Sequence, residues 1–316
     1  MASLHVVFDT ETTGLSPYKA RVLSLAACAV LVTETCDTCR VVSSFYTFVN
    51  PGPGVIIPKV ITKITGIDKS AIEHAPDFIG AWRLFETWIM QVARVYQTKN
   101  LAMTAHNAIA FDIPVIAWEL ASAGYARSPS RAWLRFVQRT GLQFVMDTLR
   151  YVKSLSHSSL YPARSRKLGD LYSAHVSGGK KLVNAHDALV DVDATVQVFY
   201  DRSSKLSSWL VPSLSAKASV VAGWSTPGAV RSFLVVAESR HAVRRPRMQN
   251  ATIKVCPSQT VISTLTTRAN VDEAARETLQ VPAATGSSAT CLSCGERWST
   301  YFQHACQTSR PTKPTT

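Results

Sequence analysis

The pattern of apolar positions in the first fifty residues predicts three strands. Residues 4–8, 22–32 and 41–49 form apolar runs rich in β-branched side chains, as is typical of strands. A short polar turn around residues 36–39 joins the second run to the third, and the proline- and glycine-rich residues 50–54 end it. We therefore expect a three-stranded antiparallel meander at the start of the chain.

After a loop over residues 57–67, the apolar positions take on a helical period. Apolar side chains recur three or four residues apart at Phe78, Trp82, Phe85 and Ile89, which predicts an amphipathic helix. The further elements that we expect are a buried strand at 101–105, a helix at 111–123, a helix beginning near Pro129, a strand at 143–146, two short helices at 147–154 and 167–175, and a last helix at 187–202. Strands first, followed by alternating strands and helices, predict an α/β fold with a mixed sheet and helices on its faces.

Beyond about residue 203 the apolar periodicity becomes patchy. Residues 220–222 and 232–236 are candidate strands, and a basic linker covers residues 244–247. We expect three parts: a main domain at 1–203, a basic extension of unknown structure at 204–285, and a small zinc-binding module with a tail at 286–316.

Composition and charge narrow the class of protein. The chain has 316 residues, of which 46% are hydrophobic and 17% charged, as in a globular protein. No apolar run reaches the ~18 residues of a membrane span, and the first strand begins too early to leave room for a signal peptide. Seven cysteines in no framework-like spacing favour reduced thiols and an intracellular protein, in a compartment that the sequence leaves open.

The net charge of +13 favours a polyanionic partner, with nucleic acid first and an anionic membrane second. The alternative is that the basic excess serves solubility alone. Charge by itself does not separate these interpretations.

Two acidic residues, Asp9 and Glu11, follow the first strand run. Residues two apart on a strand point to the same face, so the two carboxylates would repel each other unless a cation lies between them. Hard divalent cations prefer oxygen ligands of this kind. The alternative is a pair of solvated carboxylates at the end of a strand.

Three more candidates lie at the starts of expected helices. Asp112 follows the strand at 101–105, where a carboxylate also suits the helix dipole. His186 and Asp191 lie at the start of the last helix, about 140° apart around an ideal helix. His186 must therefore lie in the loop before the helix to share a site with Asp191. The alternative for His186 is a capping or surface histidine.

These residues carry a resemblance to a known family. Asp9-Thr10-Glu11, Asn107…Phe111-Asp112 and His186…Asp191 resemble the three exonuclease motifs of the DEDDh family of 3′→5′ exonucleases. This family includes the epsilon proofreading subunit of DNA polymerase III, ribonuclease T and oligoribonuclease. The segments that also resemble the family in order and spacing are 56–67, 75–78, 147–149 and 167–171. The resemblance covers about residues 4–202 and implies a ribonuclease H-like fold, with a five-stranded mixed sheet flanked by helices.

The resemblance implies a mechanism and a site. The four carboxylates of Asp9, Glu11, Asp112 and Asp191 would hold two Mg²⁺ or Mn²⁺ ions, and the imidazole of His186 would act as general base. The residues expected to bind the nucleotides at the 3′ end are Thr10, Thr13, Leu15, Thr65, Asn107 and Phe111. The expected substrate is DNA or RNA with a free 3′ end, preferably single-stranded, which is hydrolysed to nucleoside 5′-monophosphates. The rival hypothesis is a catalytically silent nucleic-acid-binding or scaffold subunit of a polymerase or RNA-processing assembly.

Two groups of basic residues have alternative interpretations. Arg131, Arg135 and Arg139 repeat every four residues, which gives one face of a helix that is either solvated or tracks the substrate backbone. The better candidates for phosphate contacts precede His186 in the sequence and are Arg164, Arg166, Lys167, Lys180 and Lys181.

The C-terminal region carries a weaker metal-binding pattern. Cys291, Cys294, His304 and Cys306 could supply four ligands to one structural Zn²⁺ ion. The second half of this pattern departs from the common histidine spacings, so the alternative is a tail with incidental cysteines. Cys36 and Cys39 lie on a hairpin turn and are interpreted as incidental.

Overall fold

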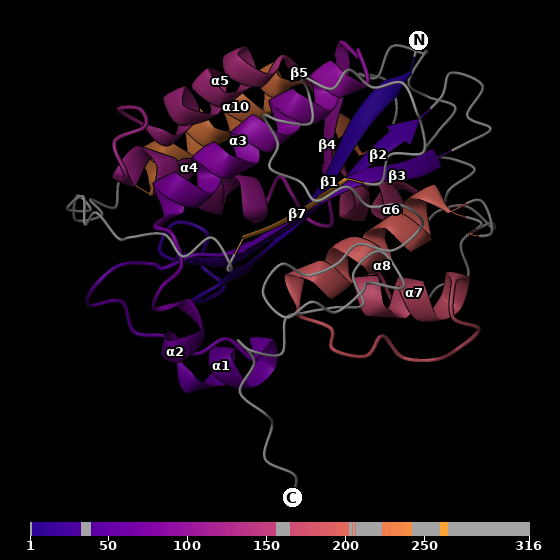
Figure 1. The fold of residues 1–316 in the computed structure, drawn as a ribbon, viewed down its shortest axis with the longest axis horizontal. Coiled ribbons are helices and arrows are strands. Elements are labelled where there is room, and N and C mark those ends of the chain that lie inside the picture. The colour runs from indigo at the N-terminus through magenta and orange to yellow at the C-terminus, as the bar shows by residue number, and fades with distance from the viewer. Residues whose placement is uncertain are drawn as a thin grey trace, which may run out of the picture.

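The strands of this protein form one mixed sheet. The computed structural model describes residues 2–32, 39–155, 165–201, 204, 206, 223–241 and 260–264. Its strands are β1 (Ser3–Thr12), β2 (Val22–Val32), β3 (Cys39–Phe48), β4 (Asn100–Ala105), β5 (Leu142–Asp147), β6 (Trp224–Ser225) and β7 (Thr260–Thr264). Within the described part of the chain, seven strands lie in the order β6-β5-β4-β1-β2-β3-β7 (Figure 1).

The pairing of these strands confirms the predicted meander and the mixed sheet. β1 pairs antiparallel with β2, and β2 pairs antiparallel with β3. β1 also pairs parallel with β4, which in turn pairs parallel with β5. The carboxyl ends of β1 and β4 therefore meet at one edge of the sheet, where Asp9, Glu11 and Asp112 lie.

Helices cover both faces of the sheet. They are α1 (Lys59–Thr65), α2 (Lys69–Ile72), α3 (Phe78–Val95), α4 (Asp112–Ser122), α5 (Pro129–Thr140), α6 (Thr148–Leu155), α7 (Leu168–His175), α8 (Ala188–Tyr200) and α10 (Pro227–Arg240). One face packs against α3, α4, α5 and α10, and the other against α6, α7 and α8 (Figure 1). α1 and α2 lie apart from both layers, beside a small hydrophobic cluster of their own.

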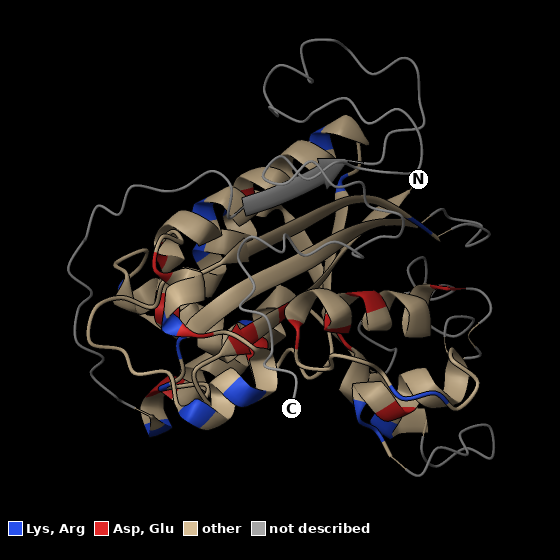
Figure 2. Cartoon of the chain, turned by 60° about the horizontal axis from the view of Figure 1, so that its bottom comes forward, with Lys and Arg blue, Asp and Glu red and all other residues tan. Residues whose placement is uncertain are grey.

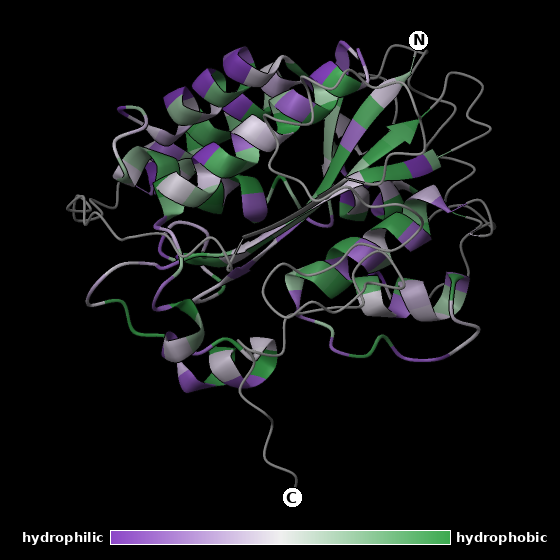
Figure 3. Ribbon diagram, viewed as in Figure 1, coloured by the Kyte–Doolittle hydropathy of each residue, from purple (hydrophilic) through white to green (hydrophobic). Residues whose placement is uncertain are grey.

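Alternation along β1 assigns its side chains to the two layers. Leu4, Val6 and Phe8 are buried in the cluster that includes α3, α4 and α5, whereas Val7 is buried in the cluster that includes α8. Hydrophobic residues follow the strands and the inner sides of the helices (Figure 3). Asp9 and Glu11 share the side of Val7, so β1 directs both carboxylates toward α8.

Most of the predicted helices and strands are confirmed, and two predictions are wrong. Residues 57–67 were expected as a loop, but Lys59–Thr65 form α1, with Pro58 before it and Gly66 in the left-handed region at φ 74° after it. None of the residues of α1 is buried, so apolar periodicity did not mark this helix.

The second wrong prediction is the strand at 232–236, because these residues lie inside α10. The buried residues of α10 are Val230, Leu234 and Ala237, which have helical spacing, and a short apolar run does not separate strand from helix. The other candidate strand, 220–222, lies outside the described residues.

The segment expected as an extension of unknown structure adds to the main sheet. β6 pairs with β5 and β7 pairs with β3, so the five expected strands gain one strand at each edge. α10 contributes Val230, Leu234 and Ala237 to the hydrophobic cluster that α3, α4 and α5 share. In the described part of the chain, no helix has the length and apolar character needed to cross a membrane.

Candidate active site

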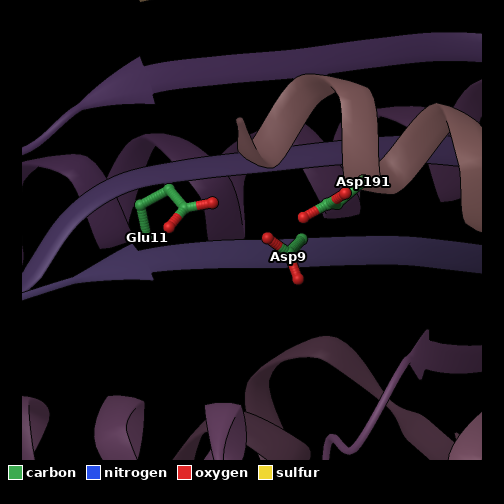
Figure 4. Close-up of side chains that lie close together, drawn as sticks. All are labelled: Asp9, Glu11 and Asp191. Carbon is green, nitrogen blue, oxygen red and sulfur yellow. The ribbon is translucent and has the colours of Figure 1, made fainter. Parts of the chain in front are cut away.

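Three carboxylates meet where β1 passes the start of α8. Asp9 and Glu11 come from β1, and Asp191 comes from the first turn of α8 (Figure 4). One oxygen atom from each of the three lies within 4.8 Å of the others. Sequence separation between Glu11 and Asp191 is large, so only the packing of α8 against β1 and β2 creates this cluster.

Asp112 lies beside these carboxylates as the first residue of α4 and is 3% exposed. Its Oδ1 atom accepts a hydrogen bond from the hydroxyl of Thr10 at 2.8 Å. It is not one of the three residues whose oxygens fit within 4.8 Å, but its negative charge helps to raise the pKa of Asp9. Thr10, which was expected to contact the terminal nucleotide, is 6% exposed, and its hydroxyl donates this hydrogen bond to Asp112.

Burial and mutual repulsion disfavour ionised carboxylates in this site. Burial first, and then the charges of neighbouring acids, raise the pKa of Asp9 well above its ordinary value and the pKa of Glu11 to about 9. Burial also raises the pKa of Asp112 to about 7 and that of Asp191 to about 6. A divalent cation would offset this repulsion, and an all-oxygen donor set suits Mg²⁺ or Mn²⁺. The residues present therefore fit the expected metal site.

His186 lies in the segment before α8, as the spacing to Asp191 required. Its backbone has φ 69°, which is uncommon for a residue other than glycine, and its amide donates a hydrogen bond to Asp191 Oδ2 at 3.1 Å. Asp187 caps α8 by accepting a hydrogen bond from the Leu189 amide at 3.1 Å. The His186 side chain is exposed, so the imidazole is open to solvent while the backbone orients Asp191.

The other expected nucleotide-binding residues are spread over three segments. Thr13 accepts a hydrogen bond from the Arg21 amide at 2.9 Å, and Leu15, in the same connection between β1 and β2, is 88% exposed. Thr65 ends α1 and donates its hydroxyl proton to the carbonyl of Ile61 at 3.0 Å.

Asn107 and Phe111 lie between β4 and α4. Asn107 has φ 76°, and its carbonyl accepts a hydrogen bond from the Phe111 amide at 3.0 Å. Phe111 is partly buried against the cluster of the α3–α5 layer. Their roles toward a nucleotide stay predictions.

Asp147 was not among the predicted site residues, but it supports this part of the site. Asp147 ends β5, is fully buried, and accepts hydrogen bonds from the amides of Ile109 and Arg150, each at 3.1 Å. It thereby fixes the segment that leads to Asp112, whose pKa its charge raises. An acid at the end of a strand was already the signal that singled out Asp9, and the same signal applies to Asp147.

Glu119 and Arg21 form a second supporting contact that the sequence did not reveal. Arg21 Nη1 lies 2.5 Å from Glu119 Oε2, and Glu119 Oε1 accepts a hydrogen bond from the Val22 amide at 3.1 Å. Glu119 lies two turns after Asp112 on the same helix, so α4 contacts β1 at Thr10 and the start of β2 at Val22. This pair joins residues 98 apart in the sequence, which no local pattern indicates.

The arginines of the predicted helix near Pro129 lie on α5, in the layer on the other side of the sheet from α8. Arg139 Nε lies 3.3 Å from Glu86, and Arg135 stacks over the ring of Tyr125 at 4.8 Å and donates to its carbonyl. The proposed zinc ligands Cys291, Cys294, His304 and Cys306, together with Cys36 and Arg164, lie outside the described residues.

This chain is similar to known exonucleases and polymerases. The profile of the RNase T family, which is described as exonuclease, matches residues 6–199. A DNA polymerase III of PolC type from Caldanaerobacter subterraneus subsp. tengcongensis is 29% identical over 216 residues, which cover 68% of this chain and 13% of that protein. The PolC-type polymerase of Bacillus subtilis is 35% identical over 109 residues, which cover 34% of this chain and 6% of that protein. The chain therefore spans only a small part of the length of these relatives.

Solved structures give weaker similarities. Escherichia coli exonuclease I in complex with a dT13 oligonucleotide aligns with a TM-score of 0.46 at 17% identity, over 63% of this chain and 40% of that one. Cell-death related nuclease 4 aligns with a TM-score of 0.46 at 16% identity, over 63% of this chain and 62% of that one.

The family match spans β1 to α8, which together contain Asp9, Glu11, Asp112 and Asp191. It confirms the predicted ribonuclease H-like exonuclease fold, and with it the enzyme class of phosphodiester hydrolases. The chain belongs to the RNase T family of exonucleases.

Proposed function

We propose that this chain is a metal-dependent 3′→5′ exonuclease that releases nucleoside 5′-monophosphates from a free 3′ end. The observation that carries this proposal is the carboxylate cluster, in which Asp9, Glu11 and Asp191 each place an oxygen within 4.8 Å of the others. Such a cluster is costly without cations, because burial and repulsion raise the pKa of its members. Its position within the part of the chain that matches an exonuclease family supports a catalytic role.

The carboxylates of Asp9, Glu11 and Asp191, with Asp112 beside them, would hold two Mg²⁺ or Mn²⁺ ions. When bound, such ions stabilise the charge that develops on the phosphoryl group and lower the pKa of a coordinated water. The imidazole of His186 would accept the proton of the attacking water, since its side chain is exposed beside Asp191. The His186 amide keeps one Asp191 oxygen oriented, which leaves the other oxygen available to a cation.

We propose single-stranded DNA as the substrate and a replication or repair polymerase as the functional partner. The support is that the curated relatives are named as DNA polymerases III of PolC type. A single-stranded end would be preferred because a paired terminus must first unstack, at a cost of a few kcal/mol.

The test compares linear and circular single-stranded DNA, with a linear RNA of the same sequence, in the presence and absence of Mn²⁺. We expect Mn²⁺-dependent release of nucleoside 5′-monophosphates from the linear DNA and none from the circle. Cutting of the circle, or release of 3′-monophosphates, would contradict the exonuclease proposal. Faster hydrolysis of the RNA would identify RNA as the substrate in place of DNA. Oligonucleotide binding without any hydrolysis would favour a silent binding subunit.

A further inference from the structure

Two basic segments that are separate in the sequence fold together beside α7. Arg166 and Lys167 immediately precede α7, whereas Lys180 and Lys181 follow it. The chain after α7 turns back along the helix, because the Gly179 amide donates to the Ser173 carbonyl at 2.8 Å. This return places Lys180 and Lys181 beside α7, the helix that Arg166 and Lys167 precede.

Contacts within the return segment define its path. The Ser177 hydroxyl donates to the Lys180 carbonyl at 2.5 Å, and the Leu182 Cβ lies 3.8 Å from the position that a Cβ on Gly169 would take. Leu182 therefore lies against the first turn of α7, next to Lys167. We call Arg166, Lys167, Lys180 and Lys181 the α7 basic surface.

Two segments link the α7 basic surface to the carboxylate site. His106, which directly follows β4 and precedes Asn107, places its Nε2 atom 3.0 Å from the Arg166 carbonyl. From Lys181 the chain continues over five residues to His186, whose amide contacts Asp191. A strand that leaves the carboxylate site in this direction would meet these cations first.

The side chains of all four cations are exposed, and an acid of α7, Asp170, is exposed among them. The surface therefore keeps a positive excess beside a site where acidic residues gather, as Figure 2 shows for the region around α7 and α8. Carboxylates repel a phosphate backbone, so an exonuclease needs cations next to its metal site to hold the strand.

Two other basic groups, those of α5 and α1, are less suited to this task. On α5, Arg139 pairs with Glu86 and Arg135 is stacked on Tyr125, and both lie in the layer on the opposite side of the sheet. The lysines of α1 lie among exposed apolar side chains, Val60 and Ile64, on a helix that stands apart from both layers.

We propose that the α7 basic surface binds the phosphate backbone of the strand on the 5′ side of the terminal nucleotide. This inference rests on the proposed function, and it assigns to these four side chains the part of the affinity that depends on substrate length and on salt. The terminal nucleotide itself is held elsewhere, at the carboxylates and the segments around them.

The test uses the full chain with Lys180→Glu and Lys181→Glu together. The matched control carries Arg83→Glu and Arg94→Glu, two exposed arginines on α3 that give the same change of net charge. The substrates are oligothymidylates of about 2 to about 16 nucleotides and the p-nitrophenyl ester of thymidine 5′-monophosphate, which lacks any upstream phosphate.

For the longest oligonucleotide we expect the KM of the α7 variant to rise about tenfold, with kcat nearly unchanged. The slope of log affinity against log salt should become shallower by about 1.4, as for two lost phosphate contacts on single-stranded DNA. Hydrolysis of the p-nitrophenyl ester and all parameters of the control should match those of the unmodified protein. Arg166→Gln with Lys167→Gln is a second variant with the same expected direction, because the Arg166 carbonyl that His106 contacts is retained.

Three results would overturn the proposal: an unchanged KM in both α7 variants, an equal loss in the control, or an equal loss of ester hydrolysis. Fluorescence anisotropy of a labelled oligothymidylate in EDTA separates this proposal from the proposed function. If the unmodified protein binds the oligothymidylate in EDTA but hydrolyses nothing in the presence of Mn²⁺, the exonuclease proposal fails. Weaker binding by the α7 variants would then still support the proposed role of the α7 basic surface.

Discussion

The helices α4 and α8 each bring a carboxylate to the same edge of the sheet, but they support it in different ways. Nine of the eleven residues of α4 are buried, and its first residue, Asp112, is held by the Thr10 hydroxyl. Asp191 on α8 is held by the main chain of His186, in a segment with exposed side chains. Substitution of the contacts that support the α4 side should therefore cost stability, whereas substitution of Asp191 or His186 at the start of α8 should cost activity alone.

The largest expected effect is that of Asp191→Ala on hydrolysis. Removal of one carboxylate from the cluster should lower turnover by about 10³-fold or more, because the charge of the transition state loses its stabilisation. In EDTA the variant should be as stable as the unmodified protein or more stable, since one source of repulsion is gone. Asp9→Ala should behave in the same way. Turnover and thermal unfolding check both statements.

The control for Asp191→Ala is Asp170→Ala, which removes an exposed acid from α7. We expect this variant to keep its turnover. Near-normal turnover in Asp191→Ala itself would remove this residue from the metal site.

The next effect concerns His186 and separates its side chain from its backbone. His186→Ala should slow hydrolysis by about 10²- to 10⁴-fold, as for the loss of a general base, with unchanged Mn²⁺ affinity by calorimetry. His186 has φ 69°, which glycine adopts without strain and alanine does not.

His186→Gly is therefore the matched variant, because it lacks the imidazole but keeps the amide in place for Asp191. Equal losses in the two variants support the general base. Normal activity in the glycine variant would assign the role to the backbone amide, and lost Mn²⁺ affinity would make His186 a metal ligand.

The sequence predicted those parts of the fold in which burial leaves a regular apolar pattern along the chain. The helix α3 was predictable because burial of one face imposes a helical period, and β2 because burial of both faces gives a continuous apolar run. α1 was missed because none of its residues is buried, and α10 because its apolar run was too short to distinguish helix from strand. β6 and β7 depend on long-range pairing with β5 and β3, which no local pattern specifies.

The candidate site was predictable where chemistry is local to a motif. Asp9 and Glu11 share a strand face, and the spacing of His186 to Asp191 placed the histidine before the helix, as the structure confirms. The contacts that support the site were not predictable, because Glu119 with Arg21 and Asp147 with Ile109 join distant segments. The contact of the Thr10 hydroxyl with Asp112 was not predictable either, because the position of Thr10 on its strand does not indicate a partner 102 residues away.

On the α4 side, Glu119→Ala should destabilise the protein by about 3–5 kcal/mol. The substitution removes the carboxylate that pairs with Arg21, whose side chain is 11% exposed, and that accepts the hydrogen bond of the Val22 amide. Denaturant unfolding in EDTA measures the loss. The double variant Arg21→Met with Glu119→Leu should recover much of it, because two apolar side chains replace the buried pair. A loss below about 1 kcal/mol in the single variant would show that the pair is not important for this side of the site.

The smallest expected effect is a dependence of stability on pH that arises from the carboxylate cluster. In the folded protein the pKa of Asp191 is raised to about 6, that of Asp112 to about 7 and that of Glu11 to about 9, by burial first. In the unfolded chain these groups titrate near 4, so between about pH 4 and pH 9 the folded state binds more protons than the unfolded state. The free energy of unfolding contributed by the cluster therefore falls as the pH rises through this window.

In EDTA, the melting temperature should thus decrease by a few degrees between about pH 5 and about pH 8. Mn²⁺ competes with protons for the same oxygens, so the increase in melting temperature that Mn²⁺ causes should grow over the same range. Glu11→Gln removes the group whose pKa is raised to about 9 and should flatten both trends. The control Asp170→Ala should leave both trends unchanged. A melting temperature in EDTA that rises with pH across this window would mean that the carboxylates are already ionised and stabilised in the metal-free protein.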